Sequence, residues 1–236
     1  MSNSSSHRWR DPTDYWNTKL FRSITYRNKH GTPILKAYKG TCPAHLVAAN
    51  VAAGGKKQRV APQLVTQRSG FAHFYLDDYQ FERFWNFPIR YVDYLSTFKG
   101  ALSPDFSVYS DYPEDIQRMN VYRNRALGAY WDMCNIPVIP SISWNLPKSF
   151  QWCFDAVEPE GIVSISTVGS LRTSELKRML IMGYTEMVSR LAPITVIIYG
   201  RYPSELDDFG VRNVRVKAFY EKFEPKGDRI IEMGSL

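Results

Sequence analysis

The chain has 236 residues, of which 44% are hydrophobic and 22% charged, and a formal net charge of +7. This length and composition allow one large domain with a buried core and argue against a membrane protein, because no apolar run approaches the ~18 residues of a spanning helix. The polar start "MSNSSSHRWRDP" lacks the apolar centre of a secretion signal, so we expect a cytoplasmic protein of a bacterial or phage-infected cell.

The positive charge is confined to the first 70 residues. This segment holds 12 Lys and Arg against 2 Asp and Glu, whereas the remaining 166 residues hold 18 against 21. The balance is therefore +10 in the first part and −3 in the second. A local basic excess indicates a polyanionic partner, most often nucleic acid; the alternative is that the cations only keep an extended arm soluble. The candidate nucleic-acid contacts are Arg8, Arg10, Lys56, Lys57 and Arg59.

Two regions follow from this contrast: a basic, irregular N-terminal arm at 1–70 and an α/β domain at 71–236. In chain order, the apolar patterns of the second region predict a strand at 71–76, a helix at 88–98, a strand at 100–109, a helix at 113–135, strands at 136–144 and 161–169, a helix at 174–191, and strands at 194–200 and 214–220.

Alternating strands and helices predict a mostly parallel sheet. The pattern is compatible with either an open doubly wound sheet or an incomplete barrel. In both folds, ligands bind at the carboxyl ends of the strands, so the polar residues there are the candidates for a site.

The helix predicted from Pro113 carries an arginine on its apolar face. On a helical wheel, Arg123 lies at the centre of the apolar stripe, whereas Arg125 points toward water. The stripe consists of Ile116, Met119, Leu127, Tyr130 and Cys134. A guanidinium on a buried face needs a partner, and Asp105 lies at a similar depth if the helix returns antiparallel to its strand. We therefore expect an Asp105–Arg123 ion pair, either as a purely structural pair or as part of a site.

Three aspartates are the candidate catalytic residues. Asp78 follows the strand at 71–76, and Asp105 and Asp111 lie in and after the strand at 100–109. Carboxylates that converge at one sheet edge can share acid–base work or bind Mg²⁺, which is the candidate cofactor. The alternatives are ordinary loop aspartates and, for Asp111, a helix N-cap.

Other polar and aromatic residues near the predicted strand ends are candidates for substrate binding. Trp144 offers either a stacking surface or a lid, and Ser166 and Thr167 precede a helix that could present backbone N–H groups to an anion. The full set is Asn120, Arg123, Asn124, Trp144, Ser166 and Thr167. No phosphate loop, dinucleotide fingerprint or serine or cysteine triad is recognisable, and the three scattered cysteines indicate neither a disulfide framework nor a zinc site.

Several short motifs recur in one order: "FYLDDYQFERFWNFPIRY", "LSPDFSVYSDYP", "QRMNVYRNRALGAYW" and "VIPSISW". In them the chain resembles a DUF4417-like domain-of-unknown-function family of bacteria, archaea, phages and mobile elements. The resemblance covers about residues 70–200 and leaves the basic segment outside. It implies a shared fold and a shared site at the aspartates and binding residues named above, and it carries no known activity.

Three functions are compatible with these features. The preferred one is a phage or mobile-element protein that binds or acts on nucleic acid, as an accessory replication factor or a metal-dependent nuclease. The second is an enzyme acting on a nucleotide or phosphorylated metabolite in a strand-end cleft. The third is a non-catalytic protein that binds a host component.

Overall fold

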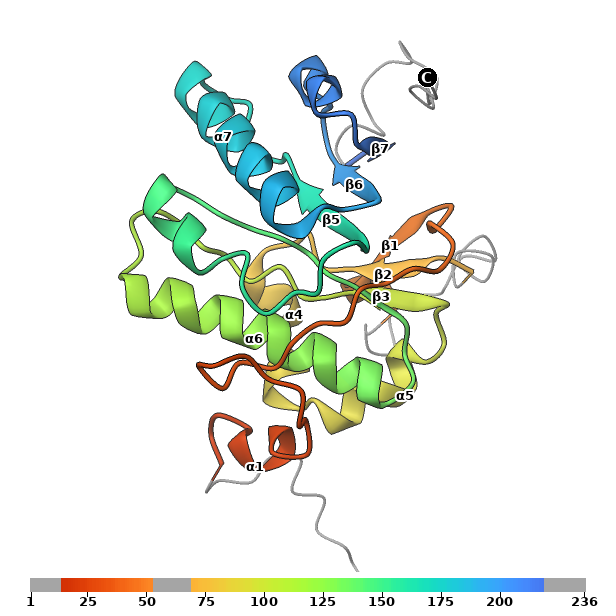
Figure 1. Cartoon of the computed structure of the whole chain (residues 1–236). Helices are drawn as coiled ribbons and strands as arrows, with labels where there is room; N and C mark the ends of the chain where they lie inside the picture. Colours follow the sequence, from red (N-terminus) through yellow and green to blue (C-terminus); the bar gives the residue numbers. More distant parts are fainter. Residues whose placement is uncertain (1–13, 53–68, 219–236) are drawn as a thin grey trace, which may run out of the picture.

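The computed structural model describes residues 14–52 and 69–218, which form two parallel sheets surrounded by helices (Figure 1). The first sheet contains β1 (Leu46–Ala48), β2 (Phe71–His73), β3 (Gly100–Leu102) and β4 (Val138–Ile139) in that order. The second contains β5 (Ile162–Ser166), β6 (Thr195–Tyr199) and β7 (Arg212–Val216). All neighbouring strands are parallel, which confirms the predicted α/β class.

Two long helices occupy the predicted positions. They are α6 (Glu114–Met133) and α7 (Ser174–Leu191). The shorter elements are α1 (Thr18–Phe21), α2 (Ala49–Ala52), α4 (Asp78–Asn86), η1 (Ile89–Tyr91), α5 (Val92–Leu95), η2 (Pro147–Gln151) and η3 (Ser204–Phe209). Helix α4 was not predicted. Within the described ranges, no helix has the length and apolar character needed to cross a membrane.

The two sheets meet at a parallel bridge between Ser141, just after β4, and Ser164 in β5. Backbone hydrogen bonds from Ile142 N to Ser164 O and from Ser164 N to Pro140 O, each 2.8 Å, hold this junction. The spatial order of the strands therefore follows their order in the chain. A doubly wound sheet requires a reversal of strand order, so the topology corresponds to the second predicted alternative, an incomplete barrel.

The strands curl around a common interior. In a flat sheet, β2 and β6 would lie about 19 Å apart, four spacings of ~4.8 Å. Instead, the ring centroid of Tyr199 in β6 lies 4.7 Å from that of His73 and 4.9 Å from that of Tyr75. The interior cluster takes buried side chains from β1 to β6: Leu46, Phe71, Leu102, Ile139, Ile162 and Ile197.

The opposite faces of the strands pack against the helices. In the second sheet, Val163 and Ile165 of β5 alternate with inward-facing neighbours and pack in one cluster with Tyr184 and Met187 of α7. This alternation explains the continuous apolar runs in the sequence, because strands buried on both faces need apolar residues on both. Figure 1 shows α7 beside β5 and β6 and α6 along the first sheet.

Part of the predicted N-terminal arm belongs to this domain. Strand β1 forms the edge of the first sheet, and Phe21 and Leu35 are buried in the same cluster as α6 residues. Leu35 N also donates to Ala156 O at 3.0 Å. Residues 14–52 are therefore integrated in the fold and are not a separate arm. The predicted contacts Arg8, Arg10, Lys56, Lys57 and Arg59 lie outside the described residues.

Candidate functional site

The carboxyl ends of the first four strands bring polar side chains to one edge of the barrel. Strand β2 leads into Tyr75 and Asp78, β3 leads into Asp105, and β4 leads into Ser141 and Ser143. Parallel strands end at the same edge, so side chains that follow different strands can meet there. This edge is the candidate site.

Asp105 is the central acid of this edge. The hydroxyl of Ser143 donates a hydrogen bond to Asp105 Oδ1, and the residue keeps partial contact with solvent. Burial of the carboxyl group among neighbouring atoms raises its pKa to about 7; the bond from Ser143 opposes this shift and the negative charge of Asp78 adds to it. The Asp105 carboxyl group can therefore gain or lose a proton near neutral pH.

Asp78 lies in the first turn of α4 and contacts the loop after β3. Its Oδ1 accepts hydrogen bonds from the hydroxyl of Ser107 at 2.9 Å and from the Ser107 backbone N–H at 3.2 Å. Burial raises the pKa of Asp78, whereas the bonds from Ser107 and the charge of Arg123 lower it. The two acids are thus held by different serines, and the charge of Asp78 contributes to the raised pKa of Asp105.

Arg123 points inward but has a different partner from the one expected. Its guanidinium pairs with Glu82 of α4, lies 3.7 Å from the ring centroid of Phe106, and donates to Asn120 Oδ1 at 3.2 Å. The predicted Asp105–Arg123 ion pair is wrong. Helix α4, absent from the sequence prediction, packs against α6 and supplies the nearer carboxylate.

The prediction that Arg125 points toward water is also wrong, because this residue is only 1% exposed. Its guanidinium donates to four acceptors: Asn124 Oδ1 at 2.6 Å, Cys153 O at 2.7 Å, Asp155 O at 3.1 Å and Ser141 O at 3.3 Å. The wheel placed it on a solvent face, but α6 is covered on nearly all sides from Asn124 to Trp131. Burial lowers the pKa of the Arg125 guanidinium to about 10, so it remains charged at neutral pH.

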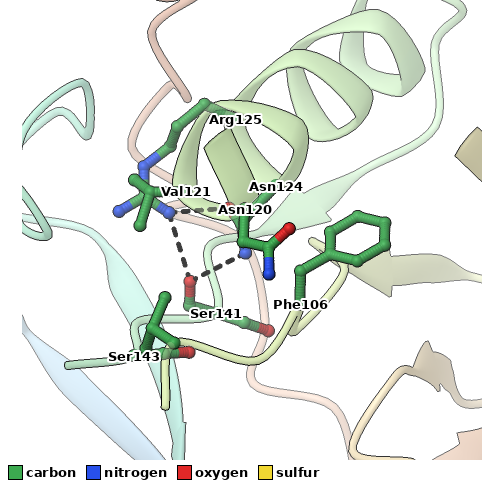
Figure 2. A pocket seen from close by; sticks show the side chains of 8 residues that line it. Phe106, Asn120, Val121, Asn124, Arg125, Ser141 and Ser143 are labelled. Atoms are coloured by element: carbon green, nitrogen blue, oxygen red, sulfur yellow. Dashed lines mark hydrogen bonds between the residues drawn. The ribbon is translucent and has the colours of Figure 1, made fainter. Parts of the chain in front are cut away.

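A small polar cavity lies between α6 and the segments after β3 and β4 (Figure 2). Its volume of about 10 Å³ is close to the space of one water molecule. The lining residues are Phe106, Val108, Asn120, Val121, Asn124, Arg125, Ser141 and Ser143. Ser143, the hydrogen-bond donor of Asp105, therefore also faces this cavity.

The two predicted asparagines fix the loop after β3. Asn124 Nδ2 donates to Pro104 O at 2.6 Å, and Asn120 Nδ2 donates to Ser107 O at 2.7 Å. Asn124 Oδ1 also accepts from the hydroxyl of Ser103 at 3.0 Å. Both amides thus hold the segment that carries Asp105, and these hydrogen bonds make them positioning residues of the candidate site.

The remaining predicted residues are more dispersed. Asp111 is exposed in the loop before α6, and no hydrogen bond links it to Asp78 or Asp105 in the part of the chain that the structure describes. Trp144 packs on α7, where its indole N–H donates to Met179 O at 3.3 Å. Ser166 accepts from Val168 N at 3.2 Å within its own turn, and Thr167 donates to Arg201 O at 2.7 Å in the segment after β6.

Trp144 also explains a glycine in α7. A Cβ atom built on Gly183 would lie 1.9 Å from Trp144 Nε1. The glycine therefore makes room for this indole ring. The close approach shows that Trp144 packs against α7.

Sequence reasoning missed Tyr75, Ser143 and Glu82. The hydroxyl of Tyr75 donates to Ser164 Oγ at 2.8 Å inside the barrel, and its pKa is raised by burial and by the charge of Asp105. Ser143 follows Ser141 at the two-residue spacing of a strand, a signal that both serines face the same side. No spacing or motif in the sequence indicates that Glu82 is the partner of Arg123.

A metal centre has no evident ligand set in this region. Across residues 14–52 and 69–218, no group of three or more His, Cys, Asp or Glu side chains is arranged to hold a metal ion. Asp78 and Asp105 could supply two oxygen ligands, and Asp111 is not shown to supply a third.

Comparison with known proteins places the chain in a family. A family model described as "Domain of unknown function (DUF4417)" matches residues 27–215, which is most of the chain. The chain belongs to this family. Because the DUF4417 match starts at residue 27, the expectation that all of 1–70 lies outside it is wrong, in agreement with the packing of residues 27–52 into the fold.

Curated relatives in the DUF4417 comparison come from mycobacteriophages. The chain is 38% identical over 150 residues to the Gene 1 protein of Mycobacterium phage L5, covering 63% of this chain and 65% of that protein. It is 34% identical over 190 residues to the Gene 1 protein of Mycobacterium phage D29, covering 79% and 69%. The association with phages is thus shown. No solved structure matches the chain.

Proposed function

We propose that this phage-associated DUF4417 protein is an enzyme of the host cytoplasm that uses Asp105 as a general acid or base. The observation that carries the proposal is the position of the Asp105 carboxyl group at the strand-end edge of the barrel, where Ser143 donates to it and burial raises its pKa to about 7. Acid–base catalysis is most effective when the pKa of the catalytic group lies near the working pH. Asp78 carries a second carboxyl group at the same edge, where burial raises its pKa and the hydrogen bonds from Ser107 lower it.

A phosphorylated small molecule, such as a nucleotide, is the substrate class that this edge supports best. Strands β6 and β7 continue into Arg201 and Lys217, so cations follow two of the parallel strands at the edge that bears the acids. Cations near a site attract anionic ligands and raise their local concentration. In this arrangement Asp105 exchanges the proton, and Asn120 and Asn124 hold the loop that carries it.

The Asp105→Asn variant is expected to lose catalysis while keeping its fold. Nucleoside phosphates and sugar phosphates would be incubated with the full chain, and their conversion followed by ³¹P and ¹H NMR. Loss of a general acid or base lowers the rate by about 10²–10⁴-fold. Asp111→Asn is the matched control, because this exposed aspartate lies in the same loop. Undiminished conversion by Asp105→Asn contradicts the proposal.

Nucleic-acid binding through residues 1–70 is a second candidate, supported by the +10 balance of that segment. Binding there would suit an accessory replication factor, or a nuclease if Mg²⁺ were bound by Asp78 and Asp105 together with oxygen atoms of the substrate. The candidate contacts are Arg8 and Arg10 near the N-terminus and Lys56, Lys57 and Arg59 in the 53–68 segment. Their positive charge is the observation that supports this second candidate.

Replacing Lys56, Lys57 and Arg59 together with alanine is expected to weaken DNA binding at low salt. The logarithm of affinity should fall less steeply with the logarithm of salt concentration, by about 0.7–1 slope unit for each phosphate that the variant no longer neutralises. Fluorescence anisotropy with labelled single- and double-stranded DNA measures both quantities. Replacing exposed Arg172 and Arg178 is the control. A slope that the triple variant leaves unchanged would rule out these contacts.

A further inference from the structure

We propose that a cavity next to Asp105 is the binding site for the base of a nucleotide; this inference rests on the proposed function and names its substrate more closely. The cavity has a volume of about 210 Å³ and lies between the loop after β3, the first turns of α6 and the segment after β4. Asn145, in its wall, follows Ser143 by two residues, about 7 Å along an extended chain. The cavity therefore lies one strand step along the chain from Ser143, the serine that donates a hydrogen bond to Asp105.

Two aromatic rings give the cavity surfaces suited to a planar ligand. Tyr112 is 37% exposed, and its ring meets that of Tyr109 edge-on at 5.2 Å between centroids. Trp152 is 7% exposed, with the Arg118 guanidinium 5.1 Å from its ring centroid. Trp152 is therefore a buried part of the wall, and Tyr112 supplies the exposed ring; exposed aromatic rings near cations are typical of sites that stack nucleobases.

The wall also contains polar groups held in fixed orientations. Asn145 Nδ2 donates to Gln117 Oε1 at 2.7 Å, and Gln117 Nε2 donates to Tyr112 O at 2.7 Å. Asn145 Nδ2 also donates to Val108 O at 2.7 Å, and Asn145 Oδ1 accepts from Leu146 N, so protein partners hold both amides in place. In addition, the indole N–H of Trp152 is buried without a hydrogen-bond acceptor among the described residues. This nitrogen is shielded from solvent, so it is not a donor that faces the open cavity.

The charges at the cavity favour an anionic ligand. The Glu114 carboxylate forms salt bridges with Lys148 Nζ at 2.5 Å and with Arg118 Nη2 at 2.8 Å, so two cations share one carboxylate. The bonds from these two cations lower the pKa of Glu114, which keeps it ionised. The three groups together carry one net positive charge, which suits the phosphate of a nucleotide beside its base.

Isothermal titration calorimetry on the full chain tests the inference, with the four nucleoside monophosphates as one set of ligands and short single-stranded oligonucleotides as the other. Wild type is expected to bind at least one set. Tyr112→Ala should weaken this binding by about fivefold or more, since stacking on one ring contributes at least that much. Tyr112→Phe should bind as wild type does. Tyr79→Ala is the matched control, because Tyr79 is 77% exposed and lies outside the cavity wall.

Each outcome decides a separate point. Binding of monophosphates supports a free nucleotide as the source of the base, and binding of oligonucleotides alone supports a single strand. No binding by wild type, or unchanged binding by Tyr112→Ala, overturns the base site. Asp105→Asn is expected to bind ligand as wild type does but to lose catalysis. If Asp105→Asn lost catalysis while Tyr112→Ala bound ligand as wild type does, the base site would be overturned and the proposed function would stand.

Discussion

Replacing Arg125 with methionine is expected to lower the free energy of unfolding by about 3–5 kcal/mol. Methionine keeps most of the length of the side chain but none of its donors. Of the four oxygen atoms that Arg125 serves, Asn124 Oδ1 and Ser141 O keep a second donor, whereas Cys153 O and Asp155 O lose the bond from Arg125. Each buried acceptor left unpaired costs about 1–3 kcal/mol unless water or repacking compensates. The total is comparable with the cost of removing one partner from a buried ion pair.

Urea unfolding monitored by circular dichroism measures this destabilisation. Arg190→Met is the matched control, because Arg190 is a partly exposed arginine of α7 whose pairing with Glu186, four residues earlier, contributes about 0.3–0.5 kcal/mol. Arg125→Lys should also destabilise the protein, since an ammonium group cannot reproduce the planar set of donors. A methionine variant as stable as wild type would mean that Arg125 does not hold these segments together.

The stability of the protein is expected to decrease as pH rises from 4 to 7, and Asp105→Asn should remove part of that decrease. The folded pKa of Asp105, about 7, is above its value of ~3.9 in an unfolded chain. Between these values the folded state binds more protons than the unfolded state, so the free energy of unfolding falls by up to ~1.4 kcal/mol per pH unit. Below pH 4 both states are protonated and the penalty disappears.

The measurement is a series of urea unfolding curves from pH 4 to 8. Asp105→Asn should show a shallower dependence than wild type and a higher relative stability at pH 8, where the charged carboxylate is costly. Asp111→Asn should follow the wild-type curve, because its side chain is exposed. If the Asp105→Asn curve ran parallel to that of wild type, Asp105 would titrate at an ordinary pKa and the acid–base proposal would lose its main support.

Long periodic segments were predictable because one helix or one buried strand determines their pattern. Helix α7 has the predicted bounds, and β5 and β6 lie inside the predicted strands. The lengths of the short strands were overestimated. Strand β3 ends at Leu102, two residues before Pro104, although the apolar pattern continues to Tyr109. A proline has no backbone N–H for a neighbouring strand, so it ended the pairing that the pattern suggested.

The candidate site stays a prediction, and its contacts were predicted only in part. Asp78 and Asp105 follow the neighbouring parallel strands β2 and β3, so the rule that parallel strands end at one edge places both there without tertiary detail. The partners of the two arginines could not be predicted, because a helical wheel assumes a single buried face. Helix α6 is covered by the sheet on one side and by α4 and the segment around Cys153 on others, so Arg123 found Glu82 and Arg125 became buried.

The junction between β4 and β5 links the acidity of the site to the arrangement of the two sheets. Ser143, which donates to Asp105, is only two residues beyond the Ser141–Ser164 bridge that joins them. A small rotation of one sheet against the other would lengthen that hydrogen bond and leave the carboxylate less solvated. The pKa of Asp105 would then rise, so the protonation state of this acid depends on how the two sheets pack against each other.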